Sequence, residues 1–143
     1  MQKMNGPFIL IAEDDIDDRM LLQTAFDEIA IKSKIEFVGN GCEVMDFLYK
    51  DDKLGYPRFI LLDLNMPKKD GRETLKEIKQ HPEFRKIPVI VFTTTKNESE
   101  INRCYELGAN SYIVKPDSFE LLKKIISELC NYWFNLTAAP RRS

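Results

Sequence analysis

Short apolar runs alternate with longer amphipathic runs along this chain, and this alternation constrains its fold more than any other feature. It is typical of a parallel α/β sheet, in which each strand is followed by a helix that returns the chain to the same edge. We expect the central three strands to be covered on both faces. The expected strands are Phe8–Ala12, Ile35–Val38, Phe59–Leu62, Val89–Phe92 and Ser111–Val114.

The runs that follow the strands carry apolar residues at helical spacing, which predicts helices with one core-facing side. In the first and last helices these residues are Leu22, Ala25, Phe26 and Ile29, and then Leu122, Ile125, Ile126, Leu129, Cys130 and Trp133. The helix boundaries agree, because Asn97 and Asp117 each precede a glutamate by three residues and can cap a helix. Gly108 suits the left-handed end of the fourth helix, and Lys50–Arg58 has the composition of an exposed loop.

The length of 143 residues predicts one domain with a core of its own, which we place at residues 1–136, followed by a flexible tail at 137–143. The chain has 21 basic and 23 acidic side chains, and this balance gives no reason to expect binding to nucleic acid or to a membrane surface. A DNA-binding output domain does not fit in this length.

The three cysteines, Cys42, Cys104 and Cys130, are widely spaced and lie in apolar helical patterns, so we expect buried, reduced thiols. Residues 1–7 lack the apolar core of a signal peptide, and no run is long enough for a membrane span. Together these features predict a cytoplasmic protein.

Polar residues follow four of the expected strands. In an open parallel α/β sheet, ligands bind at the carboxyl ends of the strands, so these residues are the candidates for a site. They are Glu13, Asp14 and Asp15 after the first strand, Asp63 and Asn65 after the third, Thr93 after the fourth and Lys115 after the fifth.

Neighbouring acidic strand ends concentrate negative charge, which destabilises the fold unless a cation lies there. Mg²⁺ prefers oxygen ligands and typically uses one or two carboxylates together with phosphate oxygens. An aspartate that attacks phosphorus forms an aspartyl phosphate, and Thr93 and Lys115 could supply a hydroxyl and a positive charge to the phosphoryl oxygens. The sequence therefore predicts a magnesium-dependent phosphoryl site.

The segments ILIAED, LLDLNMPKKDG, VIVFTT and YIVKP stand in this order at the expected strand ends. With them the chain resembles the receiver domain of two-component response regulators over roughly Pro7 to Tyr132. The resemblance implies a flavodoxin-like, doubly wound (βα)5 fold with strand order 2-1-3-4-5. The chain is also similar to receivers that serve cyanobacterial-type phytochrome kinases.

The resemblance implies a role for each residue of the site. Asp63 would accept the phosphoryl group, and Mg²⁺ would be held by Glu13, Asp14, Asp63 and the backbone carbonyl of Asn65. The resemblance gives Asp15 no role, and it could simply cap the first helix.

For the switch, the resemblance implies that the Thr93 hydroxyl moves toward the phosphoryl group and that the rotamer of Tyr112 follows it. Lys115 would supply the positive charge. The partner would be a sensor histidine kinase or a phosphotransfer protein, and the chain would be a signalling switch and not an enzyme with external substrates. The output would be contact with another protein or passage of the phosphoryl group along a relay, and the sequence does not distinguish these.

Three other functions use some of the same residue types. A phosphatase of the haloacid-dehalogenase type also uses an aspartate nucleophile, but it needs a second aspartate where this chain has Asn65. A nucleotide-binding Rossmann module needs a glycine-rich loop after the first strand, and none is present. A scaffold without phosphoryl chemistry would have no need of the complete acid, threonine and lysine set.

Tyr132, Trp133 and Phe134 are consecutive, and on a helix three consecutive residues cannot all face one core. If the last helix continues through them, an aromatic side chain is left exposed, which would fit a symmetric dimer through the face of the fourth helix, fifth strand and fifth helix. If the helix ends near Asn131, the aromatics could instead fold back onto the domain.

Overall fold

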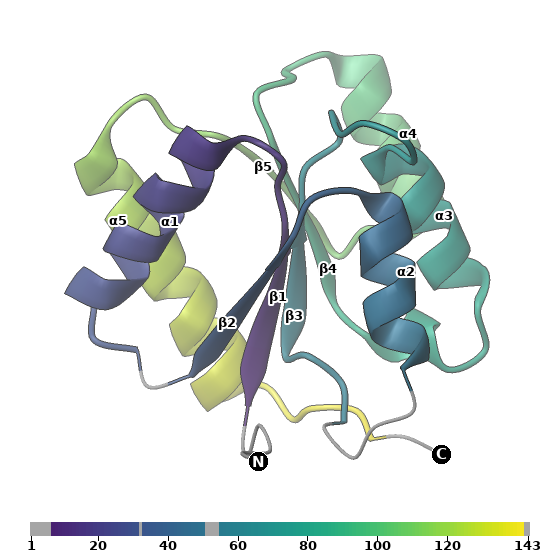
Figure 1. Ribbon diagram of the computed structural model, residues 1–143, viewed down its shortest axis with the longest axis horizontal. Helices are drawn as coiled ribbons and strands as arrows, with labels where there is room; N and C mark the ends of the chain where they lie inside the picture. Colours follow the sequence, from purple (N-terminus) through teal and green to yellow (C-terminus); the bar gives the residue numbers. More distant parts are fainter. Residues whose placement is uncertain (1–6, 32, 51–54, 142–143) are drawn as a thin grey trace.

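The computed structural model describes residues 7–31, 33–50 and 55–141, and within them five parallel strands form one sheet in the order β2-β1-β3-β4-β5. Helices α1 (Ile16–Glu28) and α5 (Phe119–Cys130) cover one face of the sheet, whereas α2 (Gly41–Tyr49), α3 (Gly71–Gln80) and α4 (Glu98–Leu107) cover the other (Figure 1). This arrangement confirms the predicted doubly wound fold and strand order. The strands are β1 (Phe8–Ala12), β2 (Lys34–Val38), β3 (Phe59–Leu62), β4 (Val89–Thr93) and β5 (Ser111–Val114).

The expected strand bounds are confirmed to within one residue, but the expected pattern of burial is wrong in one respect. The strands buried along their whole length are β1, β3 and β4, which are central in the sheet, and not the middle three in chain order. Strand β2 lies at the edge of the sheet, and its Lys34 and Glu36 fit this half-exposed position.

The helix termini follow the predicted capping chemistry with one correction. Asn97 caps α4 by accepting from the backbone of Ser99 and Glu100, and Gly108 ends that helix at φ 109°. The cap of α5 is Ser118 and not Asp117, because the Ser118 side chain accepts from the backbone N–H of Leu121. Of the expected loop at Lys50–Arg58, residues 51–54 lie outside the described part of the chain.

The chain after α5 does not continue as an α-helix. Residues Asn131–Leu136 form a π-helical turn, which changes the direction in which successive side chains point. Phe134 packs against the ring of Phe59 at 6.2 Å between centroids, and the Arg58 guanidinium lies 5.5 Å from the Phe134 ring. The aromatics thus fold back in part, while Tyr132 stays half exposed.

Two of the three cysteines are buried as expected, but Cys42 is exposed, so the prediction of three buried thiols was wrong for this residue. Burial raises the pKa of the Cys130 thiol to about 12. Among the described helices, none has the length and apolar character needed to cross a membrane.

Glycine at position 71 allows α3 to begin directly beside the backbone that follows β3. A Cβ on Gly71 would lie 2.2 Å from the carbonyl oxygen of Asp63 and 2.7 Å from Leu64 Cα. The Gly71 N–H also donates to the Leu64 carbonyl at 3.0 Å. Because both close neighbours are backbone atoms, a side chain here would displace the loop that carries Asp63.

We therefore predict that Gly71→Ala lowers the free energy of unfolding by about 1–3 kcal/mol, the usual range for overpacking. Gly39→Ala is the matched control, because its Cβ would meet only the end of the Arg19 side chain, at 3.1 Å, and the Glu43 carboxylate, at 3.5 Å. Urea denaturation of both variants measures the difference, and an equal loss in the two would contradict this account of Gly71.

Candidate functional site

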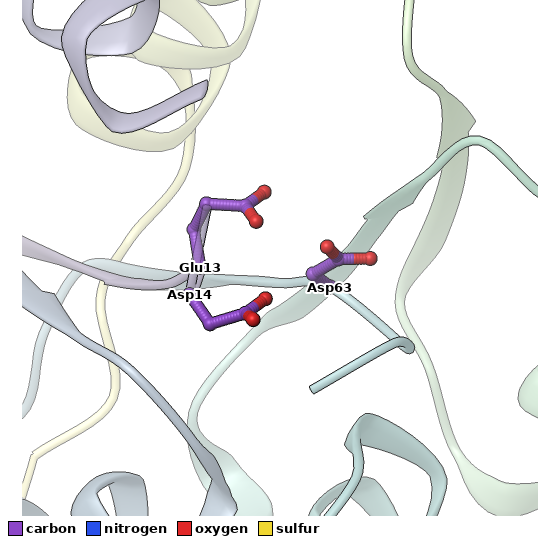
Figure 2. Close-up of side chains that lie close together, drawn as sticks. All are labelled: Glu13, Asp14 and Asp63. Atoms are coloured by element: carbon purple, nitrogen blue, oxygen red, sulfur yellow. The ribbon is translucent and has the colours of Figure 1, made fainter. Parts of the chain in front are cut away.

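Three acidic side chains meet at the carboxyl end of the sheet, where sequence analysis placed the site. Strands β1 and β3 run side by side with Ala12 level with Leu62, so the residues that follow each strand are neighbours. Glu13 and Asp14 extend toward Asp63 (Figure 2), and one carboxylate oxygen from each lies within 4.8 Å of the others. Glu13 and Asp63 are buried, whereas Asp14 is exposed.

Lys115 lies at the centre of the negative charge. It follows β5, and its Nζ is 2.6 Å from Glu13 Oε1, 2.8 Å from Asp18 Oδ2 and 3.2 Å from Asp63 Oδ2. The backbone N–H of Lys115 donates to the Thr93 carbonyl at 2.8 Å, which fixes the start of the loop after β5. The predicted Lys115, Glu13 and Asp63 are therefore brought together.

Burial and charge act in opposite directions on these groups. The pKa of Glu13 is raised to about 7, chiefly by burial and in smaller part by the charge of Asp63, although the hydrogen bond from Lys115 opposes both. Burial alone would lower the pKa of Lys115, but hydrogen bonds to Asp18 and Glu13 raise it above its ordinary value. The ammonium group therefore stays protonated.

The raised pKa of Glu13 determines the sign of its effect on stability. Because the folded-state pKa of about 7 lies above the ordinary 4.5, the folded protein binds the proton more tightly than the unfolded chain does. This contribution to the free energy of unfolding is complete below pH 4.5 and is lost as the pH rises through about 7. A cation at the site would favour the ionised form of Glu13.

Thr93 is the last residue of β4 and is completely buried. Its side-chain oxygen is the one buried side-chain polar atom in the described part of the chain without a hydrogen-bond partner. A buried hydroxyl without a partner costs stability, so such groups are rare in native proteins. Its position at the edge that also carries Asp63 suggests that a ligand could supply the missing partner.

Tyr112 links β5 to the loop after β4. Its hydroxyl donates to the carbonyl oxygen of Thr95 at 2.8 Å, and its backbone N–H donates to the hydroxyl of Tyr105 on α4 at 3.1 Å. The ring packs against the core between the sheet and α2, α3 and α4. Tyr112 thus contacts the segment that begins with Thr93.

The remaining predicted residues also lie at this edge. The backbone N–H of Asn65 is 3.3 Å from Asp63 Oδ1, so the loop after β3 curls around the carboxylate. Asp15 caps α1, because its Oδ1 accepts from the backbone N–H of Asp18 at 3.0 Å, which confirms the capping role considered for it. Sequence analysis missed Asp18 itself, which contacts Lys115 from the first turn of α1.

The donor set at this edge suits a hard divalent cation. Three carboxylate oxygens lie within reach of one ion, and the pKa of buried Glu13 shows the cost of keeping negative charge there without a further cation. Carboxylates are the ligands that Mg²⁺ and Mn²⁺ share. The side chains of Glu13, Asp14 and Asp63 would hold the ion.

The fold and this acidic site together define a class of phosphorelay signalling domain, and comparison with known proteins agrees. The family model described as the response regulator receiver domain matches residues 9–127. The chain belongs to this family. It is therefore a two-component signalling protein with a site for a divalent cation, of a class that interacts with a histidine kinase or a phosphotransfer partner.

Two curated relatives resemble nearly the whole chain. The probable methanogenesis regulatory protein FilR2 of Methanothrix harundinacea is 39% identical over 137 residues, covering 94% of this chain and 88% of that protein. Response regulator Rcp1 of Synechocystis sp. is 37% identical over 135 residues, covering 92% of each protein. The predicted similarity to phytochrome-associated receivers is supported by a solved structure of such a protein, the cyanobacterial phytochrome response regulator RcpA.

Solved structures add information about metal and phosphorylation in relatives. The Mn²⁺-bound form of Rcp1 has a TM-score of 0.83 at 36% identity, covering 94% of this chain and 99% of that one. The phosphorylated cyanobacterial phytochrome response regulator RcpA has a TM-score of 0.85 at 36% identity, covering 94% of this chain and 98% of that one.

We predict that Mg²⁺ or Mn²⁺ stabilises the folded chain, by about 2.7 kcal/mol at a concentration 100 times Kd. Asp14→Asn should weaken this effect, since it removes a carboxylate of the cluster. Asp17→Asn is the control, because Asp17 is an exposed acid of α1 outside the cluster. Thermal unfolding at increasing cation concentrations, with EDTA as the reference, measures the stabilisation. Equal stabilisation of the two variants would show that the ion binds elsewhere.

Proposed function

We propose that Asp63 accepts a phosphoryl group from the phosphohistidine of a sensor histidine kinase or phosphotransfer protein, in a reaction that depends on Mg²⁺. The observation that carries this proposal is the buried Thr93 hydroxyl, which has no partner within the described residues and lies at the same edge as Asp63 and Lys115. A phosphoryl group on Asp63 would bring an acceptor oxygen to this edge.

The chemistry divides among the residues of the site. An oxygen of the Asp63 carboxylate attacks phosphorus, and the bond to the donor breaks with its electron pair leaving on the donor nitrogen. Lys115 and Thr93 donate hydrogen bonds to the phosphoryl oxygens. Mg²⁺ held by Glu13, Asp14, Asp63 and the backbone carbonyl of Asn65 would neutralise charge on the transferring group.

The same contacts provide a route from phosphorylation to a surface. If the Thr93 hydroxyl moves toward a phosphoryl oxygen and draws the following loop with it, the Thr95 carbonyl in that loop would move as well. This carbonyl accepts from the Tyr112 hydroxyl. Tyr112 also binds Tyr105 of α4. Phosphorylation would thus shift the population toward a different arrangement of α4, β5 and α5.

This surface also suits a homodimer. β5 is an edge strand, and a groove beside it is lined by Ser111 and Ile113 of β5 together with Leu129 of α5. Tyr132 adjoins the groove, and Leu136 follows on the same turn with 68% exposure. A second copy could cover these apolar groups around a two-fold axis.

The first test is phosphorylation by acetyl phosphate and Mg²⁺, followed by intact-protein mass spectrometry. We expect one added phosphate that is absent in Asp63→Asn, because the nucleophile is gone. Asp117→Asn should keep the modification, since this exposed aspartate near Lys115 lies outside the carboxylate cluster. Undiminished phosphate on Asp63→Asn would show that another residue is the acceptor.

The second test separates phosphorylation from the switch. Thr93→Ala should still accept phosphate but lose most of the phosphorylation-dependent chemical-shift change around Tyr112, because the hydroxyl that moves is absent. Its neighbour Thr94 is exposed, so Thr94→Ala should keep the change. NMR spectra with and without phosphorylation report it, and a full response in Thr93→Ala would refute the coupling.

The third test concerns the dimer. Since Phe134 packs on the domain itself, the informative variant is Tyr132→Ser/Leu136→Ser, which alters exposed groups. Sedimentation equilibrium should show that it dimerises more weakly than the parent chain, phosphorylated or not. Tyr49→Ser on α2, which is equally exposed, serves as control. A parent chain that stays monomeric in every condition would exclude the homodimer.

A further inference from the structure

Asp18 is a third carboxylate on Lys115 and lies outside the acidic cluster that could hold a cation. Its Oδ2 is 2.8 Å from Lys115 Nζ, closer than the 3.2 Å between that Nζ and Asp63 Oδ2. Asp18 and Lys115 also face the same cleft of about 200 Å³, between α1 and the start of α5. Asp18 is therefore at the site, but it has no role in the cation binding or the phosphoryl transfer proposed above.

The number of protons on an ammonium group limits what Lys115 can bind. A lysine Nζ carries three donors, and Glu13, Asp18 and Asp63 accept one each. To donate to an oxygen of an incoming phosphoryl group, Lys115 has to release one of them. In the unphosphorylated protein, these carboxylates thus compete with the incoming phosphoryl group for the hydrogen bonds of Lys115.

Burial indicates which carboxylate is released. The Glu13 side chain is 3% exposed, so losing Lys115 would leave a buried acid without its cationic partner. Asp63 becomes the acyl phosphate only when the transfer is complete, so its own contact with Lys115 is still present when the phosphoryl group arrives. The Asp18 side chain is 38% exposed, and water can solvate it once Lys115 moves away.

We propose that Asp18 is a positioning residue that holds Lys115 in the unphosphorylated state and releases it, so that the Lys115 N–H donates to a phosphoryl oxygen instead. This inference rests on the proposed phosphorylation of Asp63. Asp18 sets how readily Lys115 turns to the phosphoryl oxygens, and it slows phosphorylation because its contact with Lys115 must be broken first.

Three variants test this role in the full-length chain with acetyl phosphate and Mg²⁺. Asp18→Asn keeps the shape but removes the charge, and it should be phosphorylated about threefold to fivefold faster, the upper part of the range for loss of a partly exposed ion pair. Asp17→Asn is the control, because it removes the same charge from the same helical turn and the described residues include no ion pair to Asp17. Its phosphorylation rate should stay within about 1.5-fold of the parent rate, since exposed charges are screened. Asp18→Glu keeps the charge and should return toward the parent rate.

A spectroscopic signal separates positioning from a general effect on the fold. The side-chain carboxyl ¹³C resonance of Asp18 should shift on phosphorylation, since its ammonium partner leaves, whereas that of Asp17 should change little. Equal acceleration in Asp18→Asn and Asp17→Asn, slower phosphorylation of Asp18→Asn, or an unchanged Asp18 resonance would each overturn the inference. Failure of the parent chain to be phosphorylated would instead refute the proposed function.

Discussion

The ion pairs of Lys115 with Glu13, Asp18 and Asp63 are the interaction on which the rest of the structure depends. Glu13 and Asp63 are both buried at neighbouring strand ends, and without a cation their carboxylates would repel each other. Lys115 supplies one positive charge against several carboxylates. The remaining negative charge favours binding of a divalent cation, and receiver domains bind such ions.

This balance is possible because the fold fixes the strand ends. The fully buried β1, β3 and β4 leave little freedom for the residues that follow them, and Gly71 lets α3 begin against the Asp63 backbone. The same rigidity leaves Thr93 with no hydroxyl partner in the described part of the chain. If Asp63 accepts a phosphoryl group as proposed, a phosphoryl oxygen would give the Thr93 hydroxyl the hydrogen-bond acceptor that it lacks in the resting protein.

Much of the fold and the site could be predicted because both follow from short-range patterns. Apolar runs marked the strands, and the rule that ligands bind at carboxyl strand ends located Asp63, Thr93 and Lys115 without coordinates. Asp18 was missed because its contact with Lys115 depends on how α1 is turned against the loop after β5. The π-helical turn at Asn131–Leu136 was missed for a similar reason, since packing of Phe134 on Phe59 favours it and no local motif marks it.

The most direct test of the account is a crystal structure of the chain with Mg²⁺ and beryllofluoride, a stable mimic of the phosphoryl group. The account predicts beryllofluoride on Asp63, with Thr93 Oγ1 and Lys115 Nζ each donating a hydrogen bond to a fluorine. Beryllofluoride on Asp63 while the Thr93 hydroxyl still has no partner would contradict the central claim that this buried group awaits the phosphoryl oxygen.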